Sequence, residues 1–87
     1  MFGAVMFNKN SGKVVKVATN EYGSAMLKLW ALQNTTKTRA CVVVDTNERQ
    51  ILSVCIGSEG FPEVYKDKTL KDCPIEFDID ELCNIIN

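Results

Sequence analysis

Apolar residues occur in two pairs of runs, and a short polar turn separates the members of each pair. The stretches GAVMFNKNSGKVVKVAT (residues 3–19) and ACVVVDTNERQILSVCI (residues 40–56) both have this form. Apolar, β-branched runs on either side of a polar turn are typical of β-hairpins. The pattern therefore predicts two hairpins, which either a duplication or two independent turns would produce.

The turn of the first hairpin decides which side chains share a face of the sheet. A three-residue loop that ends in a left-handed Gly12 places Phe7 opposite Val15. In that register Val5 lies opposite Val17, and one face of the hairpin is uniformly apolar. A loop that is one residue longer places a lysine among these apolar side chains. Because a shift of one residue exchanges the faces of a strand, burial favours the shorter loop.

The second hairpin carries a cysteine at each outer end. With the same loop, Arg49 takes the left-handed position, where it costs about 1 kcal/mol relative to glycine. The expected cross-strand pairs are Val44–Leu52, Val42–Val54 and Cys41–Cys55. The expected apolar face of the two hairpins consists of Val5, Phe7, Val15, Val17, Val42, Val44, Leu52 and Val54. The expected opposite face consists of Ala4, Met6, Lys16, Ala18, Cys41, Val43, Ser53 and Cys55.

Residues 20–37, NEYGSAMLKLWALQNTTK, predict a helix between the hairpins. Asn20 or Ser24 can cap its start, and its apolar positions extend around more of its surface than packing on one sheet requires. Either the C-terminal helix or a partner, such as a second copy of the chain, covers the surplus face. Aromatic side chains dominate the binding energy of interfaces. One candidate protein interface is therefore Leu27, Trp30 and Ala31.

After residue 57 the pattern is less regular. Pro62 suits the first position of a short helix, and CPIEFDID alternates as an edge strand would. Asp78 followed by Glu81 is a capping arrangement ahead of an apolar stripe, so residues 79–86 predict a terminal helix. The sequence thus predicts a single α+β domain over residues 1–87. Its expected elements are two β-hairpins flanking one central helix (ββαββ) in an antiparallel sheet, an edge strand and a C-terminal helix.

The chain has four cysteines and no histidine. Without histidine the usual general base and the commonest metal ligand are missing, and we expect no catalytic site and no cofactor. Structural zinc sites use cysteines separated by two to four residues, whereas these stand at 41, 55, 73 and 83. We expect the thiols to pack as small apolar groups. A thiol- or zinc-dependent protein, with Cys41 and Cys55 paired across the hairpin, is an alternative.

Charge changes sign along the chain. Residues 1–54 carry seven Lys or Arg against three acids, and residues 55–87 carry three Lys against eight acids. From residue 72 onward there are five acids and no base. This segment can bind a basic protein surface, with Asp78, Asp80 and Glu81 as candidate interface residues. The basic first hairpin supports an alternative nucleic-acid module that would use Lys9, Lys13 and Lys16.

These features together predict a small, non-enzymatic binding or inhibitor protein that occupies a surface of another macromolecule. Such proteins are common among phage and mobile-element inhibitors of host defence and nucleic-acid-handling proteins. The apolar opening MFGAVMF is too short for a signal peptide or a membrane span, so we expect a cytoplasmic protein with a protein partner, a homo-oligomeric state and no membrane contact. A further alternative is a small-molecule sequestering protein with a pocket lined by Tyr22, Trp30 or Tyr65.

Overall fold

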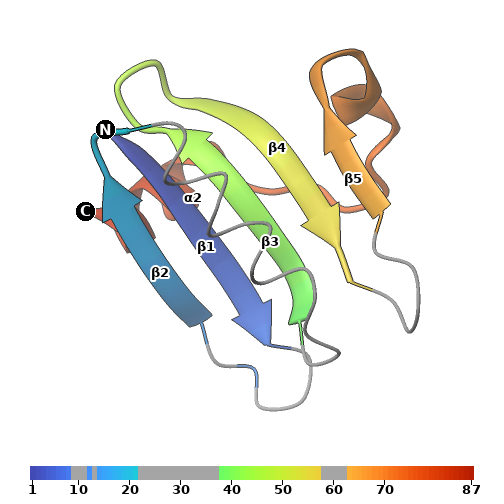
Figure 1. Ribbon diagram of the computed structural model, residues 1–87, viewed down its shortest axis with the longest axis horizontal. Helices are drawn as coiled ribbons and strands as arrows, with labels where there is room; N and C mark the ends of the chain where they lie inside the picture. The colour runs from blue at the N-terminus through green and yellow to red at the C-terminus, as the bar shows by residue number, and fades with distance from the viewer. Residues whose placement is uncertain (9–11, 13, 22–37, 58–62) are drawn as a thin grey trace.

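The computed structural model describes residues 1–8, 12, 14–21, 38–57 and 63–87. Five strands form one sheet in the order β2-β1-β3-β4-β5, and all neighbours are antiparallel. Helix α2 lies behind the sheet, and β2 and β5 are the two edge strands of the sheet (Figure 1). The elements in chain order are β1 (Phe2–Asn8), β2 (Val14–Thr19), β3 (Thr38–Asp45), β4 (Gln50–Ile56), β5 (Glu63–Lys66), the 3-10 helix η1 (Asp67–Asp72) and α2 (Ile79–Ile86).

Both predicted hairpins are present, and the predicted α+β class with an antiparallel sheet and a C-terminal helix is confirmed. The hairpins join because β1 pairs with β3. These two strands lie in the middle of the sheet, and four consecutive β3 residues, 41–44, are completely buried. Strands buried on both faces are apolar without a break rather than alternating, as the run CVVV is. The predicted central helix falls on residues 22–37, which lie outside the described residues.

The main apolar core lies between one face of the sheet and α2. It consists of Val5, Val42, Val44 and Val54 from the sheet, and Leu82, Cys83 and Ile86 from the helix. Asp78 caps α2, because its side chain accepts a hydrogen bond of 2.9 Å from the backbone N–H of Asp80. Both the predicted cap and the predicted bounds of the terminal helix are therefore confirmed.

Close packing of Gly3 and Ile86 joins the end of α2 to β1. A Cβ atom on Gly3 would lie 2.5 Å from Cδ1 of Ile86 and 2.7 and 2.8 Å from its Cγ1 and Cγ2. These distances are well inside van der Waals contact, so the helix can approach the sheet this closely only over a glycine. Gly3 is thus a packing position, whereas Gly12, at φ 69°, is a turn position with no atom near its missing Cβ.

The predicted register of the first hairpin is wrong by one residue. Phe7 lies opposite Val14, not Val15, and Val5 lies opposite Lys16, not Val17. The prediction assumed that burial would exclude a lysine from this face. However, β2 is an edge strand whose Val14, Val15 and Lys16 are all exposed, so the longer loop buries no charge.

The predicted register of the second hairpin is right near the cysteines and wrong near the turn. Cys41 lies opposite Cys55 and Val42 opposite Val54, as predicted. An irregularity between residues 43 and 44 then places Val44 opposite Ile51 instead of Leu52. Leu52 consequently packs on the other face of the sheet, against the cluster of Ala4, Cys41, Val43 and Cys55. Arg49 has the expected left-handed backbone, with φ 51°.

Two predictions for the C-terminal part are also wrong. The short helix expected to begin at Pro62 is not seen over residues 63–66, which pair with β4 as strand β5, so tertiary pairing overrides the local preference. The expected edge strand over CPIEFDID is not a strand. Its alternation has another cause: the intermediate side chains of Cys73, Phe77 and Ile79 pack on the core of the sheet.

We predict that Gly3→Ala lowers the free energy of unfolding by about 1–3 kcal/mol, the usual cost of overpacking a core. Ile86→Ala removes all three contacting atoms and costs about 2–5 kcal/mol by leaving a cavity. In the Ile86→Ala background, Gly3→Ala should then cost much less than it does alone. Urea unfolding of the two single variants and the double variant measures this coupling.

Gly12→Ala is the matched control. Its cost of about 1 kcal/mol comes from the positive φ, so it should add to that of Ile86→Ala without coupling. Equal costs of Gly3→Ala in the presence and absence of the Ile86 side chain would contradict the contact.

Candidate functional site

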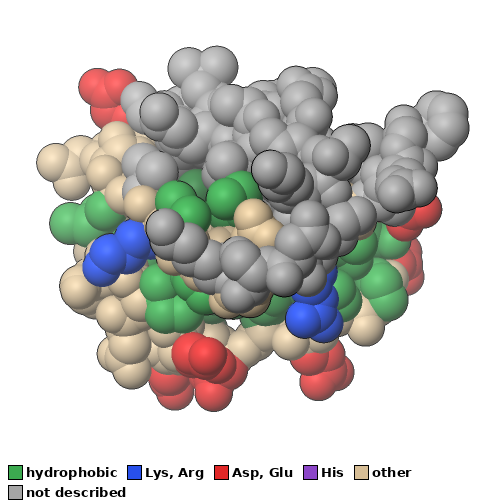
Figure 2. All heavy atoms as spheres, turned by 90° about the horizontal axis from the view of Figure 1, so that it is seen from below, with side chains coloured by type: hydrophobic (Ala, Val, Ile, Leu, Met, Phe, Trp, Pro, Cys, Tyr) green, Lys and Arg blue, Asp and Glu red, His purple; other side chains and the backbone are tan. Residues whose placement is uncertain are grey.

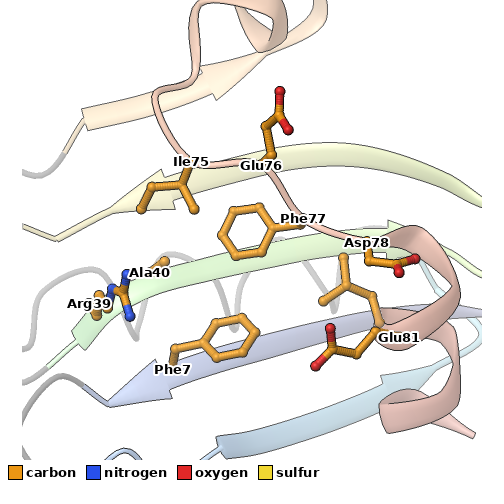
Figure 3. A pocket seen from close by; sticks show the side chains of 9 residues that line it. Phe7, Arg39, Ala40, Ile75, Glu76, Phe77, Asp78 and Glu81 are labelled. Carbon is orange, nitrogen blue, oxygen red and sulfur yellow. The ribbon is translucent and has the colours of Figure 1, made fainter.

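Residues 73–78 cross the sheet on the face that carries α2 and leave a hollow beside them. The hollow has a volume of about 220 Å³. Its lining comes from β1, β3, the crossing segment and α2, so four separate parts of the chain form it (Figure 3). The lining residues are Phe7, Arg39, Ala40, Ile75, Glu76, Phe77, Asp78, Glu81 and Leu82.

Two aromatic rings are among the apolar side chains that line this hollow. The rings of Phe7 and Phe77 stack with their centroids 5.7 Å apart and their planes 27° from parallel. Both side chains are only partly buried. The stack fixes the crossing segment to β1 and leaves aromatic surface open to an incoming apolar group.

Charged side chains surround the rings. Arg39 lies at one end of the hollow, and Asp78 and Glu81 lie at the other (Figure 3). Glu76 also belongs to the lining, so the lining contains three acids and one base. In Figure 2, acidic side chains gather along the lower border of the molecule, below exposed hydrophobic side chains. The rim therefore favours a ligand that is positively charged around an apolar centre.

A second hollow, of about 400 Å³, lies on the other side of the crossing segment. It shares Ile75, Glu76 and Phe77 with the first, so the two hollows are neighbouring parts of one uneven surface. The remainder of its lining is Ile51, Val54, Leu70, Lys71 and Cys73.

The structure gives the three predicted interface acids different positions. Asp78 caps α2, Asp80 forms an ion pair with Arg49, and Glu81 lines the first hollow. The Arg49–Asp80 pair is exposed on both sides and connects the β3–β4 turn to α2. Asp78 and Asp80 thus help to hold the helix. Among the described residues Glu81 has no comparable structural role, and it lines the hollow.

Most of the other candidate residues lie outside the described residues. These are Leu27, Trp30 and Ala31 of the predicted helix face, Tyr22, and Lys9 and Lys13 of the predicted basic hairpin. Lys16 is described and exposed on β2. Tyr65 lies on β5, where its hydroxyl donates to Glu63, and this hydrogen bond raises the pKa of the tyrosine.

Burial makes Cys41 and Cys55 unreactive. Cys41 and Cys55 are opposite each other and completely buried. Burial, and to a smaller extent the neighbouring Cys55, raises the pKa of the Cys41 thiol from 9.0 to about 12. Burial also raises the pKa of Cys55. Both thiols therefore remain protonated near neutral pH, and the thiolate is the form that attacks electrophiles and binds metals.

In the described part of the chain, no three Cys, Asp or Glu side chains converge where they could hold a metal ion. The helices of that part are too short or too polar to cross a membrane. No family model, curated protein or solved structure matches this chain.

Sequence reasoning found Asp78 and Glu81 of the hollow but missed its third acid, Glu76, and missed Phe7, Arg39 and Phe77 as a group. Phe77 carried a signal, because it belongs to the alternating apolar series before α2. No local signal connects it with Phe7 and Arg39, since only the sheet pairing brings these three side chains together.

We predict that a maleimide at about pH 8, below the raised thiol pKa values, labels Cys73 of the folded protein much faster than Cys41 or Cys55. Cys73 is partly exposed, and its Sγ lies 3.3 Å from the carbonyl oxygen of Ile75. Peptide mass spectrometry after timed labelling gives the order, and labelling in urea is the control in which all four should react. Equal rates for Cys41 and Cys73 in the folded protein would contradict the burial.

Proposed function

We propose that this protein is a small, non-enzymatic binding protein that docks on another protein through the hollow between α2, β1 and β3. The observation that carries the proposal is the combination of an open aromatic stack with a rim of three carboxylates and one guanidinium. The matching partner surface presents an apolar side chain flanked by lysine or arginine.

The rim and the rings have different roles in such a contact. Burial of an apolar group on Phe7 and Phe77 provides most of the affinity, because interface energy is concentrated in a few aromatic anchors. Glu76 and Glu81 attract the basic neighbours of that group, which increases the association rate and the specificity. An acidic rim repels phosphate, and this supports a protein partner over the alternative of nucleic acid.

An inhibitor is a specific form of this proposal. A protein with this acidic surface would compete with nucleic acid for a basic groove on its target, as an inhibitor of a host defence or nucleic-acid-handling protein would. The predicted helix face with Leu27, Trp30 and Ala31 would be a second contact, and the cytoplasm is the compartment where such targets are found.

Selection from a library of displayed random peptides tests the proposed partner chemistry without a known target. We expect the selected peptides to carry an aromatic or large aliphatic residue next to lysine or arginine. Glu76→Gln with Glu81→Gln should weaken their binding about tenfold, since each exposed charge pair contributes up to about 1 kcal/mol. Binding of the unmodified protein should also weaken as salt rises.

Glu48→Gln with Asp67→Asn is the matched control. It removes two exposed carboxylates that lie outside the hollow and should leave peptide binding unchanged. Selected peptides that are acidic, or that bind equally well to both double variants, would contradict the proposal.

A further inference from the structure

The two edges of the sheet differ in how well they are protected against another strand. Strand β5 has only four residues, begins and ends with a charged residue, and runs directly into η1. Strand β2 has six residues, VVKVAT, of which Lys16 alone is charged. On β2, Val14 and Val15 are 41% and 38% exposed.

Exposed edge strands pair readily with other strands, because one row of their backbone N–H and C=O groups has no partner in the sheet. Native proteins protect such edges with short strands, charges, prolines or covering elements. Edge β5 has the first two of these features. Among the described strands none lies beyond β2, which forms the left edge in Figure 1 and carries a single lysine as protection.

We propose that β2 pairs with β2 of a second copy in antiparallel fashion, so that two sheets join into one across a two-fold axis. In such a pairing the axis passes through a residue that lies opposite itself. An axis at Lys16 would place two lysines opposite each other, which is destabilising. An axis at Val17 pairs residues 15–19 of one copy with the same five residues of the other. It places Lys16 opposite Ala18 of the partner subunit.

The register at Val17 also suits the remaining side chains. Val15 lies opposite Thr19 of the partner subunit, and pairs of β-branched residues are favourable neighbours across strands. The two Lys16–Ala18 contacts place no charge against a like charge. A two-fold pairing is complete with two copies and leaves β5, the protected edge, at both ends of the joined sheet.

Charge substitutions at Ala18, an exposed residue, test the register. In sedimentation velocity from about 1 to 200 µM, a range that covers weak to moderate association, the unmodified protein should form a dimer. Ala18→Lys creates two lysine pairs and should weaken the dimer about tenfold, and Ala18→Glu should strengthen it by a similar factor. The double variant Lys16→Glu with Ala18→Lys restores opposite charges and should restore the dimer.

Val64→Lys adds the same charge at an exposed position of the other edge and should leave the dimer unchanged. A protein that stays monomeric over the whole range overturns the proposal. So does a dimer that responds equally to Ala18→Lys and Ala18→Glu. Because β2 lies outside the lining of the hollow, peptide binding of the Ala18 variants tests the proposed function separately.

Discussion

The packing of α2 on the central strands is the interaction on which the rest of the structure depends. Leu82, Cys83 and Ile86 form a continuous apolar stripe that packs on the valines of β1, β3 and β4. The contact is close enough to require a glycine at position 3. A chain of this size buries little surface, and a single helix therefore provides most of the cover for this face within the described residues. Its position fixes where the segment before it must run.

The candidate site follows from that position. Because α2 packs near β1 and β2 while β5 and η1 lie at the far edge, residues 73–78 must cross the intervening strands. The crossing segment is narrower than a helix or a strand pair, so it leaves hollows on both sides. Phe77 fixes it by stacking on Phe7, and the acids that cannot be buried lie along the rim. The open aromatic surface and the acidic rim thus have the same structural origin.

The sequence predicted α2 closely because two independent signals agreed there, the Asp78 cap and the spacing of the apolar stripe. The Cys41–Cys55 register was also predictable, since a slip by one residue would exchange the apolar face of the hairpin with its more polar face. Prediction failed where these constraints weaken: at the edge strand β2, where an exposed lysine is tolerated, and at the irregularity beside Val44. The alternation over residues 73–79 was real, but it reflects contact with the core instead of pairing with a strand. Of the four parts of the chain around the hollow, only the crossing segment and α2 carried a sequence signal for the site. Phe7 on β1 and Arg39 on β3 reach the hollow through long-range strand pairing, which leaves no local signal.

The central claim is that the C-terminal segment packs on the sheet through both its helix and its crossing part. Nuclear Overhauser effects from one isotope-labelled sample test this most directly. The account predicts contacts between the Gly3 Hα protons and the Ile86 methyl groups, and between the rings of Phe7 and Phe77. Absence of the first contact in a folded protein would contradict the packing of α2. Absence of the second alone would remove the aromatic stack from the proposed docking surface.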